Sequence, residues 1–151
     1  MEIRRLQEND YVLLASAIQS LIPEDERGGG VASHAHLRRA LRNTACYFIV
    51  CLIDSAPVGY LSAFRFPAID DDCSQVYLYD IVVEEKHRRR GIGSRMIEEL
   101  KGYCRRDGAD HIWLGTSLGN EAAQKTFEGT GAAKVSETYI EYIYSLDECR
   151  T

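Results

Sequence analysis

The sequence predicts a single mixed α/β domain over residues 1–151, in which helices cover one sheet. Three observations support this fold class. A chain of 151 residues usually forms one domain and is long enough to bury a full core. Its segments follow in the order strand, two helices, three strands, helix, strand, helix and strand, which is typical of a mixed sheet with helices packed on it. No repeat, linker or low-complexity segment divides the chain.

The first half of the chain predicts two helices between a first strand and a pair of strands. Asn9 or Asp10 would cap the first helix, in which apolar residues recur at helical spacing. The apolar runs "CYFIVCLI" and "VGYLSAFRF" flank a turn and predict adjacent strands. The expected segments are strand 1–6, helix 9–21, loop 22–36, helix 36–43, strand 46–53, turn 54–57 and strand 58–66.

The second half of the chain predicts three strands and two helices. The apolar face of the first of these helices consists of Ile92, Met96, Ile97, Leu100, Tyr103 and Cys104. Gly129 or Gly131 would end the second helix. The expected segments are acidic loop 67–74, strand 75–83, the helix after Gly91, strand 111–117, helix 120–131 and strand 138–146.

The chain is acidic, with 23 Asp and Glu against 18 Lys and Arg and a formal net charge of −5. We therefore expect no general affinity for nucleic acid, whereas a polycationic partner suits this charge. His34 and His36 lack the ligand spacing of a zinc site, so no metal is expected.

The cysteines form no CxxC pair, and several lie among apolar neighbours. This pattern is typical of reduced thiols in a cytoplasmic protein. They are Cys46, Cys51, Cys73, Cys104 and Cys149. We expect neither a signal peptide nor a membrane-spanning segment.

The stretch "HRRRGIGS", residues 87–94, places positive charge at a glycine-containing turn between a strand and a helix. Such a turn is an anion site, because the first helix amides lack intrahelical partners and the helix dipole is positive there. Neither common nucleotide motif fits. The Walker lysine is missing, and Met96 stands where the dinucleotide motif has its third glycine. The alternative is a solvated basic turn that only caps a helix.

Residues Arg88 to Gly93 resemble the R/Q-x-x-G-x-G/A signature of the GNAT acetyltransferase superfamily. A second motif of that family, N-x-x-A-x-x-x-Y-x-x-x-G, is similar to the positions Asn120, Ala123, Phe127 and Gly131. The resemblance implies a GNAT fold, with a mixed, mostly antiparallel sheet and a splayed central pair of parallel strands. It also implies a single GNAT domain over 1–151 and acetyl-CoA as co-substrate.

The resemblance also implies which residues bind acetyl-CoA. Backbone amides of the glycine turn would hold the pyrophosphate, an arginine would pair with the ribose phosphate, and the preceding strand would bond the pantetheine arm. Two further contacts would come from the helix that begins at Asn120. The implied set is Ile81, Val82, Val83, Arg88, Arg89, Arg90, Gly91, Ile92, Gly93, Ser94, Asn120 and Phe127.

Asp80 is the candidate catalytic base, because a carboxylate in the apolar strand "YLYDIVV" is costly unless a cleft or a partner accommodates it. The alternatives are a charge on an open face or a partner for an arginine. The amide of Val82 or Val83 would stabilise the oxyanion. Glu141 is a second candidate base or amine ligand, and Tyr79 with Asp80 would contact the substrate.

One position departs from the family pattern. Many members have a tyrosine as general acid where this chain has Phe127. Tyr139 or Tyr142 would replace it, or the thiolate would leave unassisted.

The stretch "VYLYDIVVEEKHRRRGIGSRMIEELK" resembles the type I aminoglycoside 3-N-acetyltransferases, the gentamicin-modifying branch. This implies N-acetylation of a polycationic aminoglycoside and antibiotic resistance, with acidic loops 24–26 and 70–72 flanking the slot or simply solvated. Strict alternation would place Leu78 and Asp80 on one face of the strand. The final strand would pair across a homodimer axis. The alternatives are acetylation of another small or protein amine, and an acetyl-CoA-binding module with little turnover.

Overall fold

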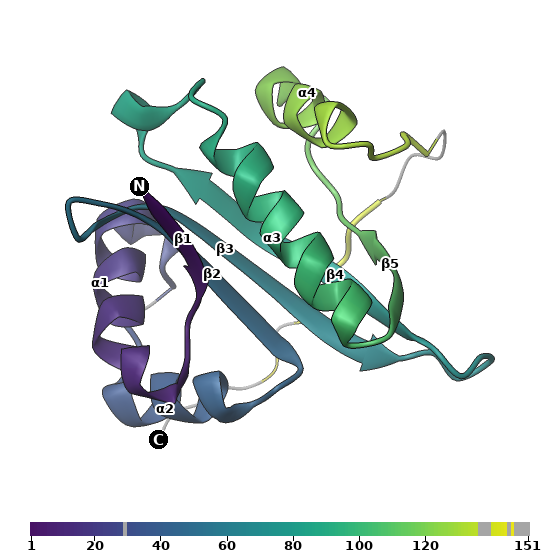
Figure 1. The fold of residues 1–151 in the computed structure, drawn as a ribbon, viewed down its shortest axis with the longest axis horizontal. Helices are drawn as coiled ribbons and strands as arrows, with labels where there is room; N and C mark the ends of the chain where they lie inside the picture. The colour runs from purple at the N-terminus through teal and green to yellow at the C-terminus, as the bar shows by residue number, and fades with distance from the viewer. Residues whose placement is uncertain (29, 136–139, 145, 147–151) are drawn as a thin grey trace.

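The computed structural model describes residues 1–28, 30–135, 140–144 and 146 (Figure 1). Its sheet has the order β1-β2-β3-β4-β5, with antiparallel neighbours except for the parallel pair β4 and β5. The expected mixed, mostly antiparallel sheet is therefore confirmed. The strands are β1 (Glu2–Arg5), β2 (Cys46–Ile53), β3 (Ala56–Pro67), β4 (Ser74–Val83) and β5 (Ala109–Trp113), and the helices are α1 (Tyr11–Leu21), α2 (His34–Arg42), α3 (Ile92–Arg106) and α4 (Glu121–Gly129).

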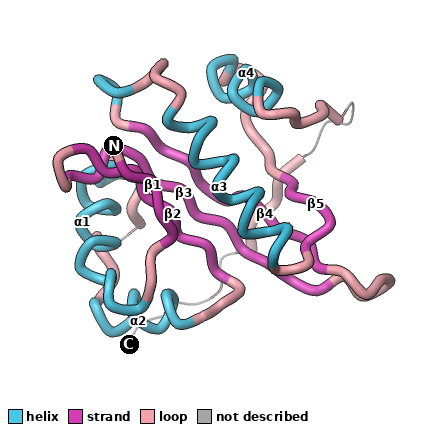
Figure 2. Tube along the Cα trace, viewed as in Figure 1, coloured by secondary structure: helices cyan, strands magenta, loops and turns pink. Residues whose placement is uncertain are grey.

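Helices cover both faces of the sheet (Figures 1 and 2). One core lies under α3 and includes Ile49, Leu61 and Met96. The other lies under α1 and α2 and includes Leu14 and Tyr60. Each fully buried apolar side chain of this size contributes roughly 1.5–3 kcal/mol, so the two cores hold the sheet between its helices.

The apolar face predicted for α3 is confirmed, with one exception. Ile92, Met96, Ile97, Leu100 and Cys104 are buried. Tyr103 is only half-buried, because its ring lies at the edge of the helix under the guanidinium groups of Arg5 and Arg106. Long amphipathic side chains cover such an edge well.

The helix starts differ from the sequence prediction for identifiable reasons. A 3₁₀ turn over Glu8–Asp10 precedes α1. The Asp10 carboxylate accepts hydrogen bonds from the Gln7 amide at 2.7 Å and from the Arg4 guanidinium at 2.9 Å, so it caps the 3₁₀ turn instead of α1. Helix α2 begins two residues earlier than expected, because the Ser33 hydroxyl accepts a hydrogen bond from the His36 amide at 3.2 Å.

Two strand predictions are wrong in extent. Strand β5 ends at Trp113 and not at residue 117, because it has a paired neighbour only as far as Tyr77 of β4. Of the strand expected over 138–146, the structure describes 140–144 and 146, and these residues form no strand. Their apolar side chains are exposed, so they lack the packed face that stabilises a strand.

The longest helix of the described ranges is α3, with 15 residues. A bilayer crossing needs roughly 20 apolar residues, and no helix of those ranges meets that requirement. Cys46, Cys51, Cys73 and Cys104 are free thiols, and Cys149 lies outside the described residues.

Candidate active site

Strands β4 and β5, the last pair of the described sheet, separate part of the way along β4. Their parallel pairing covers only Ser74 to Tyr77 of β4. From Leu78 to Val83, β4 keeps β3 on one edge and has no strand on the other within the described residues. After β5 the chain leaves the sheet toward α4 (Figure 1). The splayed strand pair predicted from the sequence is therefore present, and it exposes the backbone of residues 78–83.

A β-bulge at Tyr79 changes which face each β4 side chain occupies. Ser62 lies opposite Asp80, but the next residue of β3, Ala63, lies opposite Leu78, so Tyr79 has no partner. Leu78 and Ile81 therefore both pack on the α3 side. The expectation that Leu78 and Asp80 share a face is wrong, because one extra residue breaks the alternation between them.

The backbone of β4 presents alternate groups to the opening. The Glu84 amide donates to the Val58 carbonyl at 2.9 Å and so points toward β3. Antiparallel pairing alternates, so the N–H and C=O groups of Ile81 and Val83 point away from β3. The Val83 carbonyl accepts a hydrogen bond from Arg88 Nε at 3.0 Å. Of the two oxyanion candidates, Val83 directs its amide into the opening and Val82 directs its amide at β3.

The loop after β4 forms a backbone cradle. Arg89 and Gly91 have left-handed φ angles of 58° and 74°, and α3 begins directly afterwards at Ile92. The first amide of α3 with an intrahelical partner is that of Arg95, which donates to Gly91 O at 3.0 Å. No side chain caps the helix. The amides of Ile92, Gly93 and Ser94 are therefore left for an anion, and the exposed residues Arg88, Arg89 and Arg90 directly precede them in the chain.

Helix α4 lies beside the cradle. A Cβ atom on Gly93 would be 3.6 Å from Thr126 of α4 and 3.8 Å from Ile81 of β4, so the start of α3 fits closely between the two elements. Asn120 caps α4, because its side-chain oxygen accepts a hydrogen bond from the Ala123 amide at 3.1 Å. Phe127 is buried in the core. Both residues thus have structural tasks, and their contacts with a cofactor stay predictions.

Asp80 is half-buried on the face of α1 and α2, opposite Ser62 of β3. Burial raises its pKa, and the negative charge of Glu26 raises it further. Among the described residues, no side chain forms a hydrogen bond or ion pair with its carboxylate. The described part of the chain therefore provides no arginine partner for Asp80. Burial also raises the pKa of the nearby Tyr60 hydroxyl to about 12, and the charge of Asp80 adds to this effect. A half-buried carboxylate without a cationic partner is available to accept a proton.

The remaining predicted site residues are more scattered. Tyr79 is exposed next to Asp80. Glu141 lies in the exposed stretch 140–144, where the described residues offer it no hydrogen bond or ion pair, and Tyr142 is exposed in the same stretch. Tyr139 lies outside the described residues.

The two acidic loops lie far apart. Glu26 is near enough to Asp80 to shift its pKa. Residues 70–72 instead line an open hollow of about 490 Å³ in the turn between β3 and β4. This turn precedes Ser74, and the six residue steps from Ser74 to Asp80 along the strand span about 20 Å. Only the first loop therefore lies beside Asp80.

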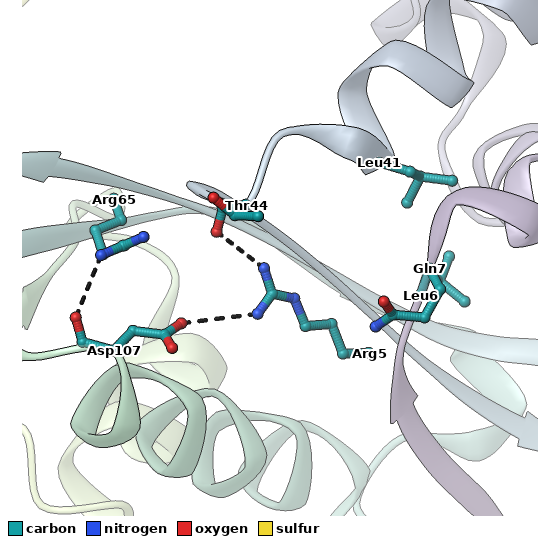
Figure 3. Close-up of a pocket in the computed structure, with 7 residues that line it drawn as sticks. All are labelled: Arg5, Leu6, Gln7, Leu41, Thr44, Arg65 and Asp107. Carbon is teal, nitrogen blue, oxygen red and sulfur yellow. Dashed lines mark hydrogen bonds and ion pairs between the residues drawn. The ribbon is translucent and has the colours of Figure 1, made fainter.

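A polar pocket of about 220 Å³ lies at the other end of α3 (Figure 3). Asp107 is one of the residues that line it. Its backbone carbonyl accepts a hydrogen bond from the Arg65 side chain at 3.2 Å. Its carboxylate accepts a hydrogen bond from the Tyr47 hydroxyl at 2.7 Å and lies 3.7 Å from the Arg5 guanidinium. Helix α3 is 15 residues long, so this pocket is about 22 Å from the cradle and separate from it. No local sequence signal indicates it, because Arg5 and Asp107 are distant along the chain.

The sequence analysis did not identify Tyr77 and Trp113 as residues near the site. They are paired across β4 and β5, and their rings are 4.4 Å apart. The parallel alignment of "QVY" with "HIW" is the signal that would have found them. Within the described ranges, no group of three or more His, Cys, Asp and Glu side chains is placed to hold a metal.

The model of the acetyltransferase (GNAT) family matches residues 14–132. The chain therefore belongs to the GNAT acetyltransferase family. Two mouse proteins, N-acetyltransferase family 8 members 3 and 7, are each 31% identical over 72 residues, which is 48% of this chain. The match spans only 32% of those relatives.

Similar solved structures include several acetyltransferases. An aminoglycoside acetyltransferase from an uncultured soil metagenomic sample, in complex with sisomicin, has a TM-score of 0.86 at 22% identity and covers 97% of this chain and 96% of its own. AAC(6')-Iy with a CoA-acetylneamine bisubstrate analogue has a TM-score of 0.77 at 20% identity, with 96% and 98% coverage. A ribosomal-protein-alanine N-acetyltransferase from Brucella melitensis biovar Abortus 2308 has a TM-score of 0.70 at 17% identity, with 95% and 100% coverage. These likenesses establish the fold.

Proposed function

We propose that this chain is an acetyl-CoA-dependent N-acetyltransferase whose substrate is an aminoglycoside, acetylated at the 3-amino group. The observation that carries the proposal is the position of Asp80. Its half-buried carboxylate lies without a cationic partner in the described structure, on the strand that borders the splay of β4 and β5. The structural likeness to aminoglycoside acetyltransferases with bound sisomicin and a neamine analogue supports the substrate class.

The residues around the splay fit acetyl-CoA. The amides from Arg89 to Ser94 would bind the pyrophosphate, because the left-handed φ of Gly91 opens the start of α3 to an anion. Arg89 and Arg90 are exposed beside it and would pair with the remaining phosphate charge. The outward amide and carbonyl of Ile81 would bond the pantetheine arm in place of a sheet neighbour, because the Val83 carbonyl already accepts a hydrogen bond from Arg88 Nε at 3.0 Å.

Asp80 would act as general base. An alkyl ammonium has a pKa of roughly 10, so the amine must lose a proton before it reacts. The raised pKa of Asp80 brings the carboxylate closer to working pH and strengthens it as a proton acceptor. The Val83 amide, directed into the opening, would donate to the oxygen on which negative charge develops.

Bound acetyl-CoA would supply the acetyl group and a thiolate leaving group. Position 127 offers no proton to that sulfur, because it is a buried phenylalanine. Thiols are far more acidic than alcohols, with a pKa of roughly 8.5 for the cysteine side chain, so a thiolate is stable enough to leave unassisted.

The second candidate is N-acetylation of another amine, such as a polyamine, an amino acid or a protein amine. The shared fold with the Brucella ribosomal-protein-alanine N-acetyltransferase favours it. A half-buried carboxylate is costly for stability, and a binding module without turnover does not need a base, so Asp80 disfavours that alternative.

Thiol release from acetyl-CoA, measured in parallel with gentamicin, sisomicin, spermidine and a lysine peptide, tests the proposal. Release with the two aminoglycosides is the expected result, and mass spectrometry would then locate the acetyl group. Release with spermidine or the peptide alone would contradict the aminoglycoside assignment. Tight acetyl-CoA binding without release would contradict the enzyme assignment.

A further inference from the structure

Five aromatic side chains form a continuous row on the sheet face that also carries Asp80. Phe64 and Tyr79 have ring centroids 5.9 Å apart, and Tyr79 and Tyr77 are 6.2 Å apart. Tyr77 and Trp113 are 4.4 Å apart, and Trp113 and Phe66 are 6.3 Å apart. The row therefore starts beside Asp80, crosses the paired end of β4 and β5, and ends on β3.

Much of this aromatic row is exposed to solvent. The exposed fractions are 68% for Tyr79, 47% for Trp113 and 38% for Phe66. Single exposed apolar residues are ordinary, but a contiguous group of large aromatic rings marks a contact surface. Tyr77 and Tyr79 share this face by ordinary alternation, and the bulge adds Asp80 to the same face.

Negative charge lies at both ends of the aromatic row. Asp80 and Glu26 lie at the Tyr79 end. The turn that contains Asp70, Asp71 and Asp72 follows Phe66 and Pro67 on β3. Arg65, which separates Phe64 from Phe66, donates to the Asp107 carbonyl and so lies on the opposite face, away from the rings. The surface thus combines flat apolar rings with acidic ends.

We propose that the aromatic row binds the sugar rings of a multi-ring polycationic amino sugar while Asp80 receives the reacting amine. This inference rests on the proposed function and names the residues that select its substrate. The C–H faces of sugar rings are flat enough to stack on Tyr79 and Trp113. The ring substituents carry ammonium groups, which are attracted to aromatic faces and to the acidic ends. A linear polyamine has the charge but no ring to stack.

Trp113 provides a direct readout, because it is the single tryptophan of the chain. We expect its fluorescence emission to change in a saturable way when sisomicin is added, and to change little with spermidine at equal charge concentration. A Trp113 that resists acrylamide quenching in the free protein would overturn the proposal, because another part of the chain would then cover this face. A saturable change without acetylation would keep the binding surface and contradict only the proposed activity.

The kinetic test compares Trp113→Ala and Tyr79→Ala with the ring-preserving variants Trp113→Phe and Tyr79→Phe. We expect KM for sisomicin to rise about tenfold in each alanine variant and about twofold or less in each phenylalanine variant. An unchanged KM for acetyl-CoA in each variant would show that the protein is still folded. Acetylation of sisomicin with an unchanged KM in both alanine variants would overturn the aromatic surface and leave the proposed function intact.

Discussion

The two ends of α3 have similar backbones and different surroundings. A glycine in the left-handed region lies at each end, Gly91 with φ 74° and Gly108 with φ 76°. At the first end no side chain caps the helix. At the second end, Asp107 is engaged by Tyr47, Arg5 and Arg65. A glycine of similar φ thus borders an open anion cradle at one end of α3 and a closed polar network at the other.

Two carboxylates of the molecule, Asp107 and Asp80, differ in the same way. Asp107 has a hydroxyl and a guanidinium as partners, whereas Asp80 has no such partner among the described residues and has a raised pKa. Polar groups that find partners inside the fold stabilise it, and those left without partners are available to a ligand. The contacts of Asp107 stabilise the fold, whereas the Asp80 carboxylate is available for the proposed chemistry.

Gly91→Asp should have the largest effect, because it adds a negative charge to the cradle. We expect acetyl-CoA affinity to fall by at least 100-fold, as measured by calorimetry. Gly91→Asn adds a side chain of the same shape without the charge, and its acetyl-CoA affinity should fall far less. Gly108→Asp places the same side chain at the same φ at the other end of α3, and its acetyl-CoA affinity should stay within about twofold. Equal losses at both glycines would remove the distinction between the two ends.

Asp80→Asn should lower kcat at least tenfold while acetyl-CoA still binds. Because the folded protein raises the pKa of Asp80, the ionised carboxylate destabilises the fold at neutral pH, above that pKa. The neutral amide should therefore raise Tm at pH 7 by about 1–4 °C. Unchanged turnover would exclude Asp80 as the base, and a lower Tm would mean that its charge has a partner.

Asp107→Ala should show the opposite pattern. Its loss leaves the Tyr47 hydroxyl without its acceptor and Arg5 without its counter-charge, which destabilises the fold by about 1–2 kcal/mol, or several degrees of Tm. Turnover per folded molecule should not change. Tyr47→Phe removes only the hydrogen bond between Tyr47 and Asp107, so it should cause part of the same loss of stability. A large fall in kcat at full stability would connect this end of α3 to the chemistry.

Glu26→Gln should have the smallest effect. In the proposed mechanism the reaction needs ionised Asp80, so kcat/KM should fall as the pH falls through its raised pKa. Removing the charge of Glu26 lowers that pKa, and the acidic limb of the pH profile should move to lower pH by less than about one unit. Glu24→Gln, in the same loop, is the matched control. A shift toward higher pH would show that Glu26 does not face Asp80.

Local patterns predict much of this fold. The spacing of apolar residues indicates the buried face of α3, and a glycine after three arginines indicates the cradle. Patterns along one strand do not reveal the bulge at Tyr79, because only the register against β3 shows an extra residue. The contact between Arg5 and Asp107, and the distance of the 70–72 turn from Asp80, depend on how distant segments pack. Such long-range contacts leave no periodic trace in the sequence.

The unpaired residue of β4 has a consequence for how the protein can diversify. On one side of Tyr79 the strand points Ile81 and Val83 at the α3 core, and on the other it points Tyr77 at solvent and Trp113. Substitutions in the exposed rings therefore leave the backbone around the opening in place. If the rings bind the acceptor and the backbone at the opening binds the acyl donor, as proposed, the two functions are separately mutable, and a chain of this design could acquire a new acceptor without rebuilding its donor site.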